Sequence, residues 1–467
     1  MSKAAGMRHE IFWQRGKAIG ARDKLAGSRS ANVVIIGGGV AGLTVADELV
    51  RRGVEDIVVL EARFCGAGAS GRSSGFITPA SELGVSELRR RFGDDEARML
   101  WDLAQGGCDS IRETIERYQI ECGYLPADSL YIASDESSFR VIEEEHQARL
   151  ALGYASRLYD RSDLPQVIGS TSYGGAVRSG QTFAINSFDY VRALSDRLAD
   201  RGVRILENSA VTAVNGDEVR TGEGVVRARS LFFCLDHGAG SIGIAPGETY
   251  HAQAFLTISE PLDPQMSHSL FPDGPQLVWD TDLVYQYFRL TSDRRLLVGG
   301  GLLSRTYARE RRHDMAPVHH LLSYIRDRFP QIIDVCFEAW WQGLIGVTKD
   351  FLPLVGTIRD SERHYVVLCA AGLPWSTFAA QAAVRMSLDG ESHLDRFFKP
   401  DRSFTEIDLL QPLIPKPLTF ALSHGYAKSY LRGDERKVSR RKKLIGAAAL
   451  AGAAAGLLKL IGKWSRL

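Results

Sequence analysis

The first clear hydrophobic pattern along the chain is the largely β-branched run Asn-Val-Val-Ile-Ile at 32–36, followed directly by a glycine-rich turn. Such a run is typical of a buried parallel strand. Apolar residues then recur at helical spacing from Leu43 to Val50, and this pattern stops at Arg52-Gly53. A second apolar run at 57–60 ends on Glu61. The order strand, turn, helix, strand predicts one βαβ unit of a parallel sheet.

The turn inside this unit carries the spacing G-x-G-x-x-G. Its first glycine permits the tight turn, the second lets the backbone approach a pyrophosphate, and the third lets the helix pack against the strand. The helix N-terminus offers N–H groups and a positive dipole end to phosphates. Glu61 lies 19 residues past the last of these glycines, where an acid accepts from ribose hydroxyls. We therefore expect a dinucleotide coenzyme on the turn formed by Gly37, Gly38, Gly39, Val40, Ala41 and Gly42.

A second glycine- and serine-rich stretch, at 66–75, follows the second strand of this unit by five residues. It either forms a flexible surface loop or supplies N–H and hydroxyl donors at the ligand-binding edge of the sheet. An extended FAD needs such donors beyond its pyrophosphate, so the loop favours FAD over NAD.

The motifs at 60–63 (Leu-Glu-Ala-Arg) and 68–75 (Gly-Ala-Ser-Gly-Arg-Ser-Ser-Gly) resemble the D-amino-acid oxidase-like FAD-dependent oxidoreductase superfamily over roughly residues 31–390. The most similar branch is that of glycine/sarcosine oxidase and γ-glutamylputrescine oxidoreductase. That branch usually has Asn-Gly where this chain has Ser73-Ser74. Some relatives attach FAD through a cysteine or histidine, but no cysteine lies near residues 348–350, where one relative has its link, so we expect noncovalent FAD and Cys65 as a buried structural thiol. The resemblance also implies cofactor contacts from Glu61, Ala62, Arg63, Ala69, Ser70, Arg72, Ser73, Ser74 and Gly75.

The resemblance assigns further cofactor contacts later in the chain. Val211 follows a helix, turn and strand pattern, and the matching valine backbone in the family contacts the adenine. A second anchor at 340–378 contains a Thr-x-Asp element ending at Asp350 and a last helix whose N-terminus faces the flavin. Many relatives have Gly-His-Gly at that turn, whereas this chain has Gly372, Leu373, Pro374 and Trp375. Pro374 removes one N–H donor, and we expect the bulky Trp375 to narrow the substrate pocket.

Residues 251–258 and 283–290 alternate as antiparallel strands do. Tyr285, Tyr287 and Arg289 share one face by the period of two. In the resembled family this sheet covers the flavin, so we expect Tyr287 and Arg289 to bind substrate, with Arg289 bidentate to a carboxylate. The alternative is an arginine on the sheet surface paired with an aspartate.

The predicted fold class is α/β. A discontinuous Rossmann-like FAD-binding domain takes residues 31–85, 182–250 and 341–392, and a substrate domain with an antiparallel sheet takes 86–181 and 251–340. Residues 1–30 form an N-terminal extension, 393–435 a polar linker, and 436–467 a basic and apolar tail.

The tail differs in charge from the rest of the chain. It carries nine basic residues and no acidic ones, which leaves a net charge of about −8 for residues 1–435 out of the total of +1. An acidic body argues against nucleic-acid binding. Residues 444–461 are apolar except for Lys459, and as a helix they would be ~27 Å long, close to the thickness of a bilayer core. The tail thus predicts a C-terminal apolar helix that spans a membrane or lies on it, with the body on the cytoplasmic side. A helix packed on a cytoplasmic body is the alternative.

The six cysteines form no C-x-x-C pair, so neither a disulfide scaffold nor a zinc site is expected, and no other metal site is evident. The resemblance implies an enzyme that oxidises a C–N bond of an amine or amino acid by hydride transfer to flavin N5, after which the imine hydrolyses. Because the flavin carries the chemistry, no catalytic side chain is named. A membrane carrier such as quinone, or oxygen, would take the electrons. A hydroxy-acid or glycerophosphate type C–O dehydrogenase, a non-catalytic flavin-binding membrane scaffold, and a homo-oligomeric state remain open.

Overall fold

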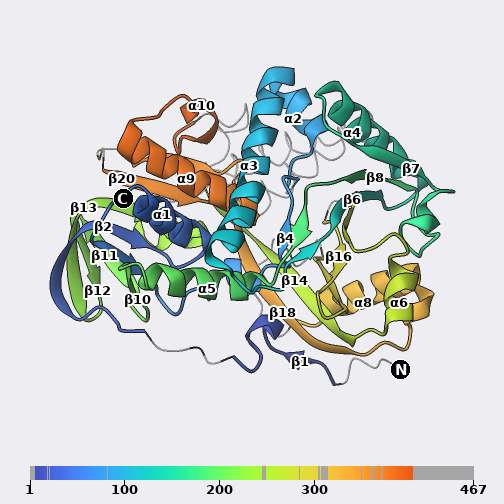
Figure 1. The fold of residues 1–467 in the computed structure, drawn as a ribbon, viewed down its shortest axis with the longest axis horizontal. Helices are drawn as coiled ribbons and strands as arrows, with labels where there is room; N and C mark the ends of the chain where they lie inside the picture. The colour runs from blue at the N-terminus through green and yellow to red at the C-terminus, as the bar shows by residue number, and fades with distance from the viewer. Residues whose placement is uncertain are drawn as a thin grey trace, which may run out of the picture.

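The computed structural model describes residues 6–402, apart from residues 18, 20, 21, 81, 245–248, 283, 303–305, 307–313, 349, 359, 360, 362, 370 and 371. Its two large sheets occupy the left and right halves of Figure 1, with helices packed against both. This mixed α/β arrangement agrees with the predicted fold class. The predicted apolar helix at 444–461 lies outside the described residues.

The first sheet contains the predicted βαβ unit. Its strand order is β10-β3-β2-β13-β12-β11. Strand β20 pairs with the C-terminal residues 231–233 of β13, beyond the part that pairs with β12, and β19 pairs with β20. Residues 33–36 and 57–60 are buried, as expected for central parallel strands covered on both faces. The first strand begins at Gly27 rather than at 32, because its early residues pair with β13. The strands are β2 (Gly27–Ile36), β3 (Ile57–Leu60), β10 (Arg204–Leu206), β11 (Val211–Asn215), β12 (Glu218–Thr221), β13 (Gly224–Phe233), β19 (Leu354–Thr357) and β20 (His364–Leu368).

One hydrophobic core joins this sheet to its helices. Apolar residues of β2 and β3 share this core with helices α1 (Val40–Arg51), α3 (Asp94–Tyr118), α5 (Ser187–Ala199) and α9 (Leu373–Asp389). Helix α3 was predicted to lie in the substrate domain, but its buried face, which includes Leu100 and Ile111, packs in this core. The short helices α2 (Val85–Phe92) and α10 (Asp395–Phe398) lie near the edge of this core, to which both contribute buried residues (Figure 1).

The second sheet has nine strands in the order β1-β18-β14-β17-β16-β15-β6-β8-β7, mostly antiparallel. Helix α8 (Ala316–Arg328) packs on the core of this sheet, together with residues of α6 (Pro264–Leu270). The predicted boundary between 340 and 341 cuts through β18, which lies entirely in this sheet. The strands are β1 (Arg8–His9), β6 (Asp128–Ala133), β7 (Arg157–Asp160), β8 (Gly175–Ser179), β14 (Tyr250–Pro261), β15 (Gln276–Asp280), β16 (Tyr287–Leu290), β17 (Arg295–Gly300) and β18 (Phe337–Val347).

Smaller elements connect the two halves. Strands β4 (Phe76–Ile77), β9 (Phe183–Ala184) and β5 (Leu125–Pro126) form a three-stranded sheet, and helix α4 (Phe139–Ala151) packs against β6 and β8. The short 3-10 helices are η2 (Phe12–Gln14), η3 (Ser70–Arg72), η4 (Glu136–Ser138), η5 (Leu164–Gln166), η6 (Asp236–Ile242) and η7 (Pro330–Ile332).

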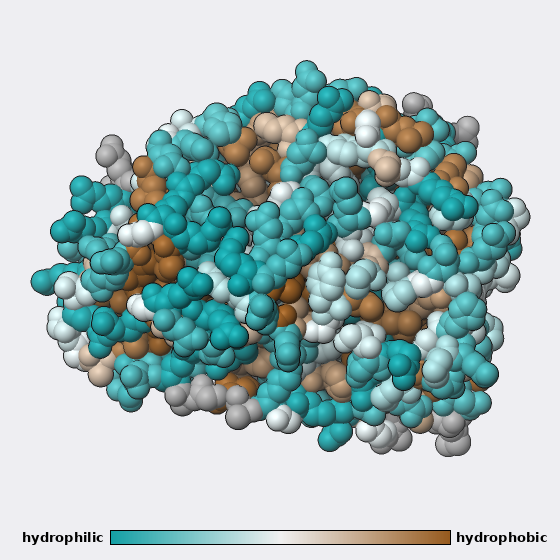
Figure 2. Space-filling view, viewed as in Figure 1, coloured by the Kyte–Doolittle hydropathy of each residue, from teal (hydrophilic) through white to brown (hydrophobic). Residues whose placement is uncertain are grey.

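The viewed surface is mostly hydrophilic, with apolar side chains in small groups between polar ones (Figure 2). No helix within residues 6–402, as far as these are described, is long and apolar enough to cross a bilayer. The tail at 436–467, on which the membrane prediction rests, lies outside that range.

Candidate active site

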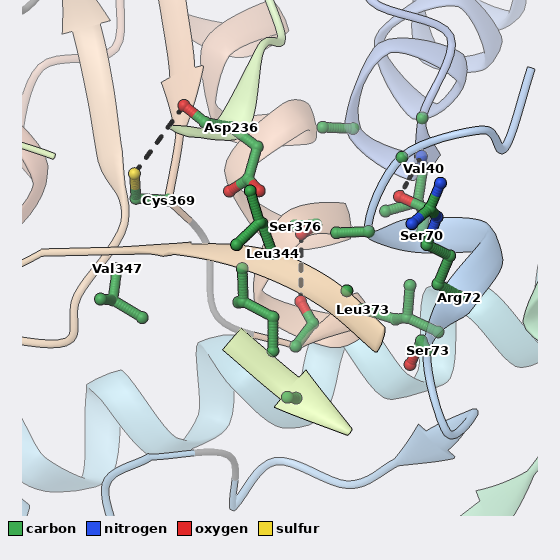
Figure 3. Close-up of a pocket in the computed structure, with 18 of the residues that line it drawn as sticks. Val40, Ser70, Arg72, Ser73, Asp236, Leu344, Val347, Cys369, Leu373 and Ser376 are labelled. Carbon is green, nitrogen blue, oxygen red and sulfur yellow. Dashed lines mark hydrogen bonds between the residues drawn. The ribbon is translucent and has the colours of Figure 1, made fainter. Parts of the chain in front are cut away.

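A cavity of about 660 Å³ lies between the two sheets. The turn after β2, the loop at 68–74, the start of β11 and the start of α9 line it from the first half of the molecule. Strands β14, β16 and β18 line it from the second half. Figure 3 shows Val40, Ser70, Arg72 and Ser73 together on one side of this cavity, with Asp236 and Cys369 on the other.

Most of the residues predicted from sequence lie on the wall of this one cavity. The lining includes Gly37, Gly39, Val40, Ala41, Glu61, Ala62, Arg63, Ala69, Ser70, Arg72, Ser73, Ser74, Val211, Tyr287, Gly372 and Leu373. Six predicted residues lie outside the lining: Gly38, Gly42, Gly75, Arg289, Asp350 and Trp375. The fold thus brings three distant parts of the sequence together as one site.

The glycines of the turn act through the space that they leave open. Gly37 has a φ of +116°, and a Cβ on it would lie 2.2 Å from the carbonyl oxygen of Cys234. A Cβ on Gly42 would lie 1.9 Å from the carbonyl oxygen of Gly37. Gly42 therefore lies outside the cavity lining and lets helix α1 pack close to the turn. Gly39 is the N-cap of α1 and has no capping side chain, so the helix N-terminus opens on the cavity.

The carboxylate of Glu61, which directly follows β3, accepts two backbone N–H groups. One oxygen accepts the N–H of Gly38 at 2.8 Å, and the other accepts the N–H of Arg63 at 2.9 Å. Each carboxylate oxygen can accept more than one hydrogen bond, so both keep capacity for a ligand hydroxyl. Glu61 is half-buried and lines the cavity, as a ribose-binding acid must.

Ser70 connects the second loop to the first turn. Its hydroxyl accepts, at 3.0 Å, the N–H of Val40, which is the first residue of α1 (Figure 3). In the space beside it, the N–H groups of Ser73 and Ser74 have no acceptor among the described residues. These donors and the α1 terminus form a row that suits an anionic, extended ligand.

Arg289 does not face the cavity, so the prediction that it binds a substrate carboxylate is wrong. Its guanidinium is buried and donates to three carbonyl oxygens: those of Ser74 at 2.7 Å, Leu290 at 2.9 Å and Ile185 at 2.8 Å. Burial lowers the pKa of Arg289 to about 9, which leaves the group charged at neutral pH. The side chain does point from the predicted face of β16, but the loop at 72–75 lies between it and the cavity.

Asp350 and Trp375 also have structural positions. Asp350 forms a bidentate ion pair with Arg402, at 2.8 and 2.9 Å, and accepts from the hydroxyl of Thr348. Trp375 is buried against Phe378 and Phe398, with ring centroids 5.8 and 6.1 Å away. The expectation that Trp375 narrows the pocket is therefore wrong, since Leu373, Pro374 and Ser376 line the cavity instead.

The sequence reasoning missed several polar residues at the far end of the cavity. The hydroxyl of Tyr285 donates to the carboxylate of Glu82 at 2.8 Å, and both residues line the cavity beside Tyr287. Gln253, on β14, is 2% exposed, and its Nε2 has no hydrogen-bond partner among the described residues. A glutamine within the predicted strand at 251–258 was the available signal, since buried polar groups need partners.

The residues of the wall fit FAD. Glu61 would hold the ribose, the α1 terminus and Ser70 would face the pyrophosphate, and the N–H groups of Ser73 and Ser74 would meet acceptors further along the cofactor. The orphaned amide of Gln253 supports a polar ligand in this cavity, because leaving such a donor unpaired costs about 1–3 kcal/mol. Within the described part of the chain, no group of three His, Cys, Asp or Glu side chains is placed to hold a metal ion.

Comparisons with known proteins agree with this assignment. The family model described as FAD dependent oxidoreductase matches residues 32–386. The gamma-glutamylputrescine oxidoreductase of Escherichia coli (strain K12) is 30% identical over 353 residues, 74% of this chain and 80% of that protein. A probable oxidoreductase, OrdL, of Haemophilus influenzae is 30% identical over 341 residues, 70% of this chain and 76% of that protein. The fold is similar to that of glycine oxidase from Geobacillus kaustophilus, with a TM-score of 0.69 at 19% identity, over 80% of this chain and 100% of that one.

Proposed function

This chain belongs to the D-amino-acid oxidase type of FAD-dependent oxidoreductases, and from that premise we propose that it oxidises the C–N bond of an amine or amino acid. It is an FAD-dependent enzyme of the amine and amino-acid oxidoreductase group. The observation that carries the proposal is that one cavity is lined both by the glycine turn after β2 and by Trp279, Tyr285 and Tyr287 on the side of the second sheet.

When bound, FAD supplies the hydride acceptor for this reaction. The protein's part is to bind and orient the substrate and to exclude water from the reacting carbon. An amine must be neutral to release a hydride, and apolar surroundings lower the pKa of a bound ammonium group. Trp279, Val284 and Phe351 provide such surroundings in the cavity lining. No side chain of the chain is needed as a base.

Two observations favour an amine that lacks a carboxylate next to the reacting carbon over an amino acid or a hydroxy acid. The carboxylate of Glu82 lies at the far end of the cavity, where it accepts a hydrogen bond from the phenol of Tyr285 and would repel a substrate carboxylate. The arginine that would have held a carboxylate, Arg289, is occupied by backbone carbonyls. The relative in Escherichia coli acts, by its name, on gamma-glutamylputrescine, which supports an amine substrate for this chain as well.

Anaerobic bleaching of the bound flavin tests the proposal. Purified yellow protein is mixed with a panel of primary and secondary amines, amino acids and hydroxy acids, and the loss of flavin absorbance is recorded. We expect bleaching by members of the amine or amino-acid sets. Bleaching by hydroxy acids alone would assign a C–O dehydrogenase, and no bleaching across the panel would favour a non-catalytic flavin scaffold.

We further propose that the tail at 436–467 brings the enzyme to the cytoplasmic side of a membrane, where a quinone accepts the electrons. The support is the composition of the tail, in which six of the eight residues at 436–443 are basic and residues 444–461 are apolar except for Lys459. Turnover of detergent-solubilised enzyme with quinone analogues and with oxygen identifies the acceptor. If removing 436–467 leaves the distribution between membrane and soluble fractions unchanged, the membrane proposal fails.

A further inference from the structure

Three successive carbonyl groups in the loop at 72–74 are each held by a large buried side chain. The indole N–H of Trp341 donates to the carbonyl of Arg72 at 2.9 Å, and the indole N–H of Trp13 donates to that of Ser73 at 2.9 Å. Arg289 Nε donates to the carbonyl of Ser74 at 2.7 Å. We call Trp13, Trp341 and Arg289 the carbonyl clamp.

The clamp acts as one unit behind the loop. The rings of Trp13 and Trp341 meet edge to face at 5.8 Å, and the guanidinium of Arg289 lies 5.9 Å from the Trp13 ring. All three side chains are at most 4% exposed. The three carbonyls therefore point toward one buried cluster, on the side of the loop away from the cavity.

This arrangement fixes the opposite side of the loop as well. In a planar trans peptide, the N–H of each residue points opposite to the carbonyl of the residue before it. The N–H groups of Ser73 and Ser74 consequently point to the cavity side, where both residues form part of the lining. The next N–H, of Gly75, is satisfied locally by the hydroxyl of Ser73 at 3.1 Å.

Trp13 comes from a segment outside the matched family region, which begins at residue 32. The segment from residue 6 to 17 runs beneath β18, with which β1 pairs in parallel (Figure 1). The guanidinium of Arg15 lies 2.6 Å from the carboxylates of both Glu10 and Glu338, and His9 stacks on Trp340 at 4.1 Å. These contacts hold Trp13 against the loop even though it precedes the dinucleotide fold in sequence.

We propose that this N-terminal segment is part of the cofactor site, with Trp13 as a positioning residue that presents the N–H groups of Ser73 and Ser74 to FAD. The proposal rests on FAD binding and not on the identity of the substrate. It gives the segment a ligand-binding role that the resemblance to the family, which starts at 31, does not include.

Trp13→Phe tests the proposal, because it keeps an aromatic ring and removes the indole N–H. We expect the Kd for FAD, measured by flavin fluorescence during titration of the apoprotein, to rise about 3- to 10-fold. Ser187 also donates to the Ser73 carbonyl, at 3.2 Å, which keeps the expected effect moderate. The visible circular dichroism of the bound flavin should change too, since the donors around it move.

Trp101→Phe is the matched control. Trp101 is a buried tryptophan on α3 whose ring packs under Arg149 and Tyr154 rather than against the loop. It should lose packing without changing the FAD Kd by more than about 2-fold. Equal Kd values and equal flavin spectra for the two variants would overturn the proposal. Failure of the unaltered protein to bind FAD would refute the cofactor assignment itself, which is a distinct result.

Proteolysis of the unaltered protein gives a second test that needs no variant to fold. Linkage requires that FAD stabilise the docked segment by the same factor by which docking strengthens FAD binding. Trypsin cleavage after Arg15 and Lys17 should therefore be at least about 3-fold slower with FAD bound. Cleavage after the exposed Arg161 serves as the control and should not change. If cleavage at the N-terminal sites is equally fast with and without FAD, the segment is not coupled to the cofactor.

Discussion

Replacing Glu61 by Gln tests the adenosine end of the site, since it removes the charge of one acid and little volume. The two carboxylate oxygens accept one backbone N–H each, from Gly38 at 2.8 Å and from Arg63 at 2.9 Å. A glutamine amide offers one acceptor oxygen and one NH₂ donor. One of the two N–H groups must then face another donor, whichever way the amide is turned.

The size of the effect follows from these contacts. A partly buried N–H that loses its acceptor costs about 1–3 kcal/mol, and a hydrogen bond to a neutral acceptor is roughly half as strong as one to a carboxylate. Part of this cost is present with and without FAD and cancels in the Kd. The charge-assisted hydrogen bonds from the ribose hydroxyls exist only with FAD bound, and we expect their loss to cost about 1.4–2.8 kcal/mol and to weaken FAD binding 10- to 100-fold.

The assay is a titration of apoprotein with FAD and, separately, with FMN, which has no adenosine. Glu61→Gln should weaken FAD binding and change FMN binding by less than about 3-fold. Glu55→Gln is the matched control, because Glu55 is an exposed glutamate in the same βαβ unit. An unchanged Kd for FAD, or equal losses for FAD and FMN, would refute the assignment of Glu61 to the ribose.

Three further predictions concern the fold and its coupling to the site. Gly42→Ala should lower the free energy of unfolding of the apoprotein by about 3 kcal/mol, because its Cβ would lie 1.9 Å from a backbone oxygen. Gly39→Ala should change this free energy by less than about 1 kcal/mol but weaken FAD binding at least tenfold. Urea unfolding and FAD titration measure the two effects. Arg402→Met should destabilise the protein by about 2–3 kcal/mol in urea unfolding, since it leaves the carboxylate of Asp350 partly buried without its ion pair. Burial, aided by the charge of Asp282, raises the pKa of Asp280 to about 6. The folded state therefore binds more protons than the unfolded state between pH 4 and 6. The free energy of unfolding should fall by up to about 3 kcal/mol as the pH rises through that window.

Each of these predictions has a control. For the glycines, equal loss of stability in both variants would show that Gly39 is also a packing position. For the ion pair, Arg52→Met removes an exposed partner of Asp389 and should cost less than about 1 kcal/mol. For Asp280, the variant Asp280→Asn should lack the pH-dependent loss, and an unaltered slope in that variant would assign the titration to another group.

The sequence could predict the dinucleotide half of the site because its determinants are local. The tight turn, the close helix and the acid after the second strand lie within residues 32–61, and glycine is the residue that the crowded turn accepts. The loop at 68–75 was recognisable for the same reason, since its glycines and serines act through their own backbone and hydroxyl groups.

Strand periodicity was informative but incomplete for Arg289. Alternation placed Arg289 on the same face as Tyr287, and Tyr287 does line the cavity. The pattern could not show that a loop from 215 residues earlier, at Ser74, lies between the arginine and the cavity. A sequence period fixes a face of a strand, whereas the neighbour on that face comes from the packing of distant segments.

Helical spacing does indicate the packing of Trp375. Trp375 and Phe378 are three residues apart on α9, so their rings share one face, and that face packs against Phe398. Asp350 finds its partner in Arg402, in a region predicted to be a polar linker. The N-terminal extension predicted at 1–30 contributes Trp13 to the wall behind the cofactor loop.

The sequence by itself determined the βαβ turn, the coenzyme class and the family, because these depend on backbone conformation and short spacing. Only the tertiary structure decided which buried donors stand behind the loop at 72–74 and which polar groups reach the substrate end. Those contacts join strands and segments up to hundreds of residues apart, and chain packing, not local pattern, sets which of them meet.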